Sequence, residues 1–322
     1  MIRWVRNRAS STLPRDGAMP TMRPTTRRHF LRNAACAAVA GPLALTRPAA
    51  AIAPIGRTRP SHLKLSLAAY SYRQFLAGKK PLMDLFDFVT LAADMALDAV
   101  ELTSYYFPPD VDTEYLHLIK QHAFLLGLDI SGSSVGNNFC VPDGPDRDKQ
   151  LELVRTWVDR AAELDAPVIR IFAGNVAKGD DEAKAVARAI EGIKASLPYA
   201  ARQGVALALE NHGGITATPD QILAIVQAID APNFGVNLDT GNFHTEDPYA
   251  DLARIAPYAI NVQVKTEITR KGHSKEEADL VKVIGILREA RYSGYVVLEY
   301  EAKEDPMKAI PRHIKTLRGL IG

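Results

Sequence analysis

The chain has 322 residues, of which 47% are hydrophobic and 24% charged, so its composition is that of a globular protein with a sizeable core. The formal net charge is +2, but residues 1–53 hold nine Arg and one Asp. The remainder therefore has 30 basic and 36 acidic residues, a net charge of about −6. Nucleic-acid binding requires a basic surface, so a nucleic-acid partner is not expected.

The amino-terminal residues resemble a targeting segment. Thr26-Arg-Arg-His-Phe-Leu-Arg32 resembles the twin-arginine export signal, and an alanine-rich apolar run over residues 33–45 follows it. Small-residue cleavage sites lie at residues 49–51 and 51–53. Because the apolar run is shorter than the about 20 residues that span a membrane, a cleaved signal is favoured over an anchor. We expect a targeting segment over residues 1–53, a linker over 54–61, and a periplasmic mature protein.

Cysteine usage adds one exclusion. Cys36 lies in the targeting segment, which leaves Cys140 as the only cysteine of the expected mature chain. An intramolecular disulfide is therefore excluded, although disulfides persist in the compartment to which export leads. The resemblance to a twin-arginine signal implies export after folding, and this hints at a metal or cofactor loaded beforehand.

The mature chain alternates apolar runs of strand length with amphipathic helical patterns. Strands are predicted over residues 65–71, 98–103, 128–134 and 167–172, and in the runs that contain Glu210, Asp239, Gln263 and Glu299. Helices are predicted over residues 82–97, 113–126, 146–164, 180–203 and 274–290, and from Asp305 to residue 320. The helix over 180–203 is expected to be kinked or split near Pro198. Two further helices are predicted to begin at Thr218 and at Asp247. Each predicted strand is thus followed by a predicted helix.

Eight such alternations predict a single-domain α/β fold, a (β/α)8 TIM barrel over residues 62–322. A doubly wound open sheet is the alternative. It would need a glycine-rich phosphate-binding turn after the first strand, and the sequence has none there.

Polar residues gather at the carboxyl ends of the last four predicted strands. Side chains alternate between the two faces of a strand, so these polar residues share the inward face near one rim of the barrel. They are Glu210 and His212 in the fifth strand, Asn237 and Asp239 in the sixth, Asn261, Gln263 and Lys265 in the seventh, and Glu299 and Glu301 in the eighth.

Three of these residues, Glu210, Asp239 and Glu299, would bring buried carboxylates close together, which is costly without compensation. One solution is a divalent cation in an oxygen-rich site, with Mn²⁺ or Mg²⁺ favoured and Zn²⁺ or Co²⁺ left open. The other is an internal salt-bridge cluster in which Lys265 and Arg170 neutralise the carboxylates.

From about residue 62 onward the chain resembles the xylose-isomerase-like TIM barrels, the sugar phosphate isomerase/epimerase family. The resemblance is carried by Glu210-Asn-His, by Asp239-Thr-Gly-Asn, by the polar residue before Val264-Lys265, and by Glu299. It implies that Glu210, Asp239, Gln263 and Glu299 hold one divalent metal ion. Gln263 stands where the family usually has His, and a carbonyl oxygen is a weaker ligand than an imidazole.

The resemblance also implies a reaction. Glu210 and Glu299 would flank a sugar, one removing a proton next to a carbonyl and the other returning it on the opposite face, through an enediolate that a metal ion stabilises. Further contacts with substrate are expected from His212, Lys265, Glu101, Asn242 and Tyr70 and from Arg170, which is also expected to pair with an acid inside the barrel.

Three functions remain open at this point. The first is a metal-dependent isomerase or epimerase of a free or keto-sugar, with lyase chemistry on keto-sugars as a variant. The second is a non-catalytic sugar-binding barrel whose metal site is weakened by Gln263. The third is an abasic-site endonuclease, which the negative charge and the few inward histidines oppose. The expected partner is a small carbohydrate without a membrane anchor, and homo-oligomerisation is left open.

Overall fold

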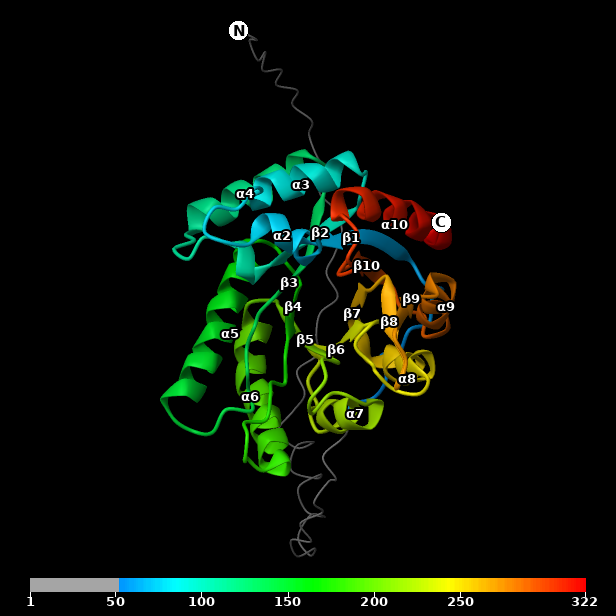
Figure 1. Ribbon diagram of the computed structural model, residues 1–322. Helices are drawn as coiled ribbons and strands as arrows, with labels where there is room; N and C mark the ends of the chain where they lie inside the picture. Colours follow the sequence, from blue (N-terminus) through cyan, green and yellow to red (C-terminus); the bar gives the residue numbers. More distant parts are fainter. Residues whose placement is uncertain (1–51) are drawn as a thin grey trace, which may run out of the picture. The chain divides into compact units, whose positions relative to one another are not determined.

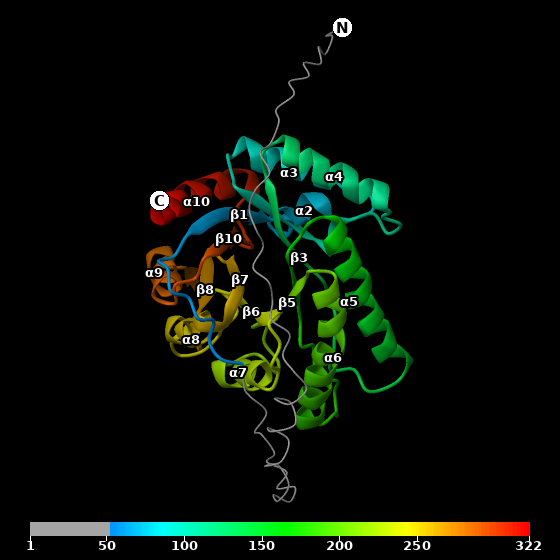
Figure 2. The ribbon, with the colours of Figure 1, turned by 180° about the vertical axis from the view of Figure 1, so that it is seen from behind.

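The computed structural model describes residues 52–322, so nearly all of the predicted targeting segment lies outside the described residues. Eight parallel strands close into a barrel in the order β1-β10-β7-β6-β5-β4-β3-β2. Helices lie around the outside of these strands (Figures 1 and 2). The predicted (β/α)8 barrel is confirmed.

The barrel strands agree with the predicted strands to within a few residues. Their bounds are β1 (Leu63–Ala68), β2 (Ala99–Thr103), β3 (Asp129–Ser134), β4 (Val168–Ile171), β5 (Ala206–Glu210), β6 (Phe234–Asp239), β7 (Ala259–Val264) and β10 (Gly294–Leu298). In the register of the barrel, Glu210 pairs with Asn237, Asp239 with Gln263, and Gln263 with Val297. The polar ends of neighbouring strands therefore meet at one rim.

The helices follow the strands in alternation. They are α2 (Arg73–Leu76), α3 (Leu85–Asp94), α4 (Thr113–Leu125), α5 (Pro145–Glu163), α6 (Glu182–Arg202), α7 (Pro219–Gln227), α8 (Pro248–Ile255), α9 (Leu280–Glu289) and α10 (Pro306–Ile321), with short 3-10 turns at Ala69–Tyr72, Ser104–Tyr106 and Ala256–Tyr258. Six of them begin after an Asp whose carboxylate accepts a backbone N–H of the first turn, and Thr218 caps α7 in the same way. None of the described helices is long and apolar enough to cross a membrane.

The structure corrects the sequence prediction in three places. Residues 274–279 are not helical: β8 (Glu267–Thr269) and β9 (Lys275–Glu277) form an antiparallel hairpin, and α9 begins only at Leu280. The helix predicted over residues 82–97 is shorter, and α2 precedes it. Pro198 lies within α6, which continues through it without a break.

The barrel interior is unusually polar for a packed core. Apolar side chains of the strands face the helices, and Leu67, Val100 and Val262 are fully buried there. The interior instead contains buried serines, amides and acids, and the hydroxyl oxygens of Ser66 and Ser131 lie 2.7 Å apart across it. Buried polar groups must be paired to be tolerated, so the pairing of these groups decides what the site can do.

Candidate functional site

The charged residues of the inward face converge at the carboxyl ends of β5, β6, β7 and β10, the rim where barrels of this kind carry their sites. Their side chains are almost sealed from solvent: the exposed fraction of the residue is 3% for Glu210, 0% for Asp239, 6% for Glu299 and 7% for Lys265. The predicted grouping of these four residues is thus present in the structure.

Lys265 forms the centre of one half of this cluster. Its ammonium nitrogen lies 2.9 Å from Glu299 Oε2, 3.0 Å from Glu301 Oε2 and 3.4 Å from Asp239 Oδ2. Burial opposes the charge on Lys265, but the three carboxylates outweigh it and raise its pKa well above the ordinary value. Lys265 is therefore a charged ammonium surrounded by acids.

Arg170 and Glu210 form the other half. Arg170 Nε lies 2.8 Å from Glu210 Oε2, and Asn242 Nδ2 donates a hydrogen bond of 2.9 Å to the second carboxylate oxygen, Oε1. Arg170 also donates to the backbone oxygen of Val135, and its guanidinium carbon lies 3.9 Å from the centre of the Phe172 ring. The expected pairing of Arg170 with an acid inside the barrel is confirmed.

Burial raises the pKa values of Glu210 and Asp239 in spite of these cations. Burial raises the pKa of Glu210 well above its ordinary value, and Asp239 and Glu299 add to this while Arg170 opposes it. Burial also raises the pKa of Asp239 to about 7, against the effect of Lys265. Carboxyl groups with raised pKa values are suited to general acid–base chemistry.

Gln263 belongs to a second network, deeper in the barrel. Its side-chain oxygen accepts a hydrogen bond of 2.7 Å from Asn237, and its nitrogen donates one of 2.6 Å to Glu101 Oε1. Asn261 Nδ2 closes the network by donating to Glu101 Oε2 at 3.0 Å and to Asn237 Oδ1 at 2.8 Å. Both carboxylate oxygens of Glu101 are thus engaged by amides.

The donors that the resemblance names as metal ligands do not fit a metal ion in this arrangement. The side chain of Gln263 is committed to Asn237 and Glu101, and Glu210 is committed to Arg170 and Asn242. Asp239 Oδ2 accepts no hydrogen bond, and Glu299 Oε2 accepts one from Lys265, so this arrangement is far from the four to six open donors of a divalent site. Among residues 52–322, no group of three or more His, Cys, Asp or Glu side chains is arranged to hold a metal ion.

The remaining predicted substrate contacts divide between the rim and the interior. His212 lies at the rim, where solvent reaches it, and the centroid of its ring is 4.3 Å from the centroid of the Phe172 ring. Desolvation of the imidazole by neighbouring groups, together with the charges of Arg170 and Lys265, lowers its pKa. Asn242 is half-buried beside Glu210. Glu101, in contrast, is fully buried within the amide network, a position that favours a structural role.

Several cavities open at this rim, and two of them bear on the charged cluster. One of about 210 Å³ is lined by Lys265 and Glu301 together with Asn242, His244 and residues of the β8–β9 hairpin. The other, about 820 Å³, is bounded by the segments that follow β1 and β2. Its aromatic lining comprises Tyr70, Phe86, Tyr105, Tyr106, Phe107 and Tyr115. Tyr70 lines this second cavity, and burial, with smaller contributions from Glu301 and Glu299, raises the pKa of its phenol.

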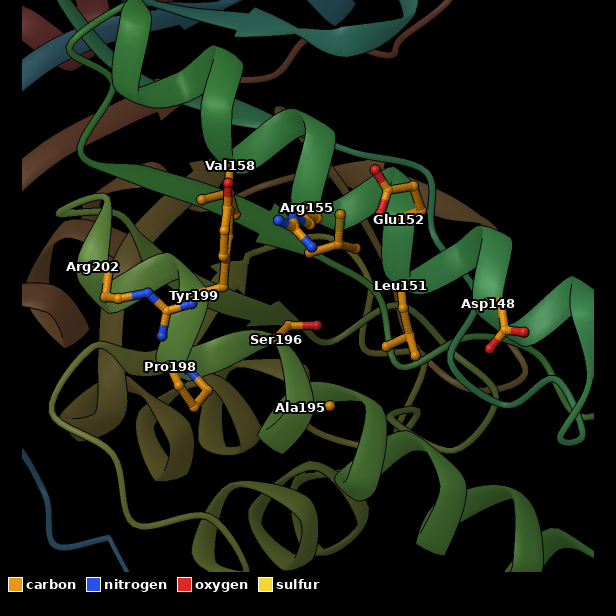
Figure 3. A pocket seen from close by; sticks show the side chains of 11 residues that line it. Asp148, Leu151, Glu152, Arg155, Val158, Ala195, Ser196, Pro198, Tyr199 and Arg202 are labelled. Atoms are coloured by element: carbon orange, nitrogen blue, oxygen red, sulfur yellow. The ribbon is translucent and has the colours of Figure 1, made fainter.

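A further groove lies on the outside of the barrel. Its volume is about 350 Å³, and all of its lining residues belong to α5 and α6, among them Arg155, Ser196 and Tyr199 (Figure 3). None of the predicted site residues lines it. This groove is therefore separate from the charged cluster at the rim.

Several residues of the site were not assigned a role from the sequence. Asn211 ties the ends of β5 and β6 together, since its amide donates to the backbone oxygen of Asp239 and its oxygen accepts the N–H of the same residue, both at 2.9 Å. Gly241 donates its N–H to Asp239 Oδ1 at 2.8 Å. The Glu-Asn and Asp-Thr-Gly-Asn motifs contain these residues, so position within the motifs was the available signal.

The family follows from a comparison of the sequence with protein-family models. Residues 89–320 match the model described as xylose isomerase-like TIM barrel, and the chain belongs to this family. An uncharacterized protein of Methanocaldococcus jannaschii is 22% identical over 173 residues, which cover 49% of this chain and 59% of that protein. The chain therefore spans somewhat more than half the length of that relative.

Solved structures share the fold at low sequence identity. A D-psicose 3-epimerase from Clostridium cellulolyticum H10 has 17% identity and a TM-score of 0.63, covering 78% of this chain and 89% of its own. A 3-keto-D-glucoside 4-epimerase from E. coli has 15% identity and a TM-score of 0.60, covering 80% and 99%. A xylose isomerase domain protein from Planctomyces limnophilus has 16% identity and a TM-score of 0.63, covering 81% and 97%.

Proposed function

We propose that this protein is a sugar isomerase or epimerase that moves a proton on the carbon next to a carbonyl group. The observation that carries the proposal is the group of buried carboxyls at the carboxyl rim, Glu210, Asp239 and Glu299, beside the two buried cations Arg170 and Lys265. Family membership and structural neighbours that are named as sugar epimerases support the same class of reaction.

Glu210 and Glu299 have the roles of the two proton-transfer groups. Arg170 and Asn242 hold the two carboxylate oxygens of Glu210, and burial raises the pKa of this group, which makes it a better proton acceptor. Glu299 directly follows β10 and accepts a hydrogen bond from Lys265. A positioned carboxylate of this kind contributes roughly 10²–10⁴-fold to the rate of proton transfer.

Lys265 and Arg170 supply positive charge where negative charge develops. When a proton leaves the carbon beside a carbonyl, charge accumulates on the carbonyl oxygen, and a fixed cation in a dry site stabilises it strongly. Lys265 lines the small cavity together with Asn242 and is almost sealed from water. A sugar bound in this cavity would thus meet the ammonium of Lys265, which contacts Glu299, and the amide of Asn242, which contacts Glu210.

The proposed substrate is a free sugar or a keto-sugar, with a keto-glycoside as the larger variant. The aromatic cavity beside Tyr70 has the lining expected of a site that accepts the flat apolar face of a sugar ring. Export to the periplasm is also part of the proposal, because sugar phosphates are mainly intracellular; it depends on residues that lie outside the described part of the chain. Elimination from a keto-sugar is a variant of the same proton abstraction.

A non-catalytic sugar-binding barrel is the second candidate. The observation in its favour is that every carboxylate of the cluster already has a cation or amide partner within the protein. Binding without turnover of any sugar would support this candidate.

Product formation from a panel of free ketoses and keto-glycosides, followed by NMR, tests the proposal. Wild type is expected to convert at least one of them to an epimer or an isomer. Glu210→Gln and Glu299→Gln should each lower the rate by about 10²–10⁴-fold, because the amide has the shape of the acid but no basicity. Glu289→Gln, at an exposed position on α9, is the control and should keep the full rate. Full activity in Glu299→Gln would overturn the two-carboxylate assignment.

A further inference from the structure

The Lys265 ammonium is surrounded by carboxylates of the protein, and Glu299 accepts a hydrogen bond from it. A lysine ammonium has three N–H donors, and here three carboxylates surround it at 2.9, 3.0 and 3.4 Å. Two of these acids, Asp239 and Glu299, are the ones that the family resemblance implies as metal ligands. The ammonium thus lies against the very oxygens that a metal ion would need.

The position of Lys265 is fixed by its surroundings. Its backbone N–H donates to Thr240 Oγ1 at 2.9 Å, which ties the end of β7 to the segment after β6. The stem of the side chain packs over Gly241, where a Cβ atom would lie 2.6 Å from Lys265 Cγ and 2.8 Å from its Cβ. Room for the lysine therefore depends on a glycine next to the acid that it neutralises.

The fourth implied ligand is held away from this point. Gln263 uses its oxygen for Asn237 and its nitrogen for Glu101, so both ends of its amide are satisfied deeper in the barrel. Turning the amide toward the rim would leave two buried polar groups without partners, which is costly. Gln263, in β7, and Lys265, directly after it, thus both oppose the binding of a metal ion at this position.

We propose that the ammonium of Lys265 is the resident cation of this site, in the place where the family resemblance implies a divalent metal ion. A metal ion bound by Asp239 and Glu299 would lie within a few ångströms of the ammonium, and the repulsion of like charges in a buried site makes the two mutually exclusive. Divalent ions therefore bind only where Lys265 is displaced or removed. The inference does not depend on which reaction the protein catalyses, because its test measures metal binding.

The test compares metal binding by the wild type and by Lys265→Ala. Each protein is analysed for bound metals after purification without chelator, then treated with EDTA and unfolded thermally with Mn²⁺, Mg²⁺, Co²⁺ or Zn²⁺ at about 1 mM, because a ligand of the folded state raises the unfolding temperature. Lys120→Ala is the matched control, since Lys120 pairs with the single carboxylate of Asp165, 3.3 Å away on the outside of the barrel.

Wild type and Lys120→Ala are expected to contain far less than one metal ion per chain and to show no metal-dependent shift. Lys265→Ala frees Asp239, Glu299 and Glu301, and should gain at least about tenfold in affinity for one of the four ions, seen as a shift of several degrees. A stoichiometric metal in wild type, or a shift in wild type as large as in Lys265→Ala, would overturn the proposal. The wild-type result decides on its own if Lys265→Ala does not fold.

Discussion

The buried cation Arg170 compensates the charge of the buried Glu210 carboxylate. Its ion-pair partner is Glu210, and it also contacts the backbone oxygen of Val135 and the ring of Phe172. Removing one partner of a buried ion pair leaves the other charge uncompensated, which costs far more than the loss of an exposed pair. The roles of the charged residues can therefore be separated by measurements of stability.

Arg170→Met is expected to destabilise the protein by about 3–5 kcal/mol at pH 8, where the stranded Glu210 carboxylate would have to be charged or take up a proton. The loss should be smaller at pH 5, since a lower pH favours the neutral form of Glu210, whose pKa is raised by burial. Urea unfolding of the wild type and the variant at pH 8 and at pH 5 measures the two losses of stability. Arg312→Met removes an exposed pair with Glu304 and should cost no more than about 1 kcal/mol; equal losses in the two variants would contradict the account.

The raised pKa of Glu101 predicts that the free energy of unfolding falls as the pH rises. Burial, with a smaller contribution from Glu299, raises its pKa from 4.5 to about 7 in the folded protein. The folded state therefore holds this proton more tightly than the unfolded chain, so its contribution is present at low pH and is lost as the pH rises through about 7. The loss attributable to Glu101 between pH 4.5 and pH 8 should be about 1–3 kcal/mol.

Glu101→Gln removes this titration, and its free energy of unfolding should fall less between pH 4.5 and pH 8 than that of the wild type. Glu191→Gln, at an exposed position of α6, should follow the wild-type curve. Parallel curves for Glu101→Gln and wild type would show that Glu101 does not titrate in this range.

At the scale of elements, the segment after β6 and the end of β7 are built to fit one another. The close approach of Gly241 to Lys265 is the contact on which this fit depends, and the carbonyl oxygen of Glu267 would lie 3.0 Å from an added Cβ as well. The backbone of Glu267 cannot move aside as a flexible side chain can. Any side chain at residue 241 must therefore displace this backbone or the stem of Lys265.

Gly241→Ala is accordingly expected to destabilise the protein by about 1–3 kcal/mol, the usual cost of overpacking a well-filled interior. Gly285→Ala is the matched control, because no atom lies within 4 Å of an added Cβ in the middle of α9, and alanine should stabilise a helix there by about 0.5–1 kcal/mol. Thermal unfolding of the two variants should give shifts of opposite sign, and a neutral Gly241→Ala would disprove the close fit.

At the scale of the whole molecule, the fold followed from the sequence because each strand and helix has its own local pattern. Buried parallel strands are continuous apolar runs, and most helices begin at Asp or Thr caps such as Thr218. The hairpin of β8 and β9 was missed for the same reason: Ser274-Lys-Glu-Glu277 has the composition of a helix start. Only the pairing of Glu267 with Glu277 and of Thr269 with Lys275 makes these residues strands.

The sequence predicted which residues lie at the site, but not which of them pair with one another. Alternation along the strands places Glu210, Asp239, Gln263 and Lys265 on the inward face, and the register brings them to one rim. Whether a metal ion or a lysine neutralises the acids depends on where the ammonium lies, and that is set by Gly241 and by the amide network around Gln263. These are contacts between distant segments, which a pattern within one strand does not contain.

The incorporation of deuterium from D₂O into a keto-sugar tests the central claim most directly, namely that carboxylates of the protein move a proton on the carbon next to a carbonyl. EDTA-treated wild type is expected to place deuterium on that carbon of at least one member of a panel of ketoses and keto-glycosides. Glu210→Gln should do so about 10²–10⁴-fold more slowly. Exchange at an undiminished rate in Glu210→Gln, or no exchange by the wild type with any member of the panel, would contradict the account.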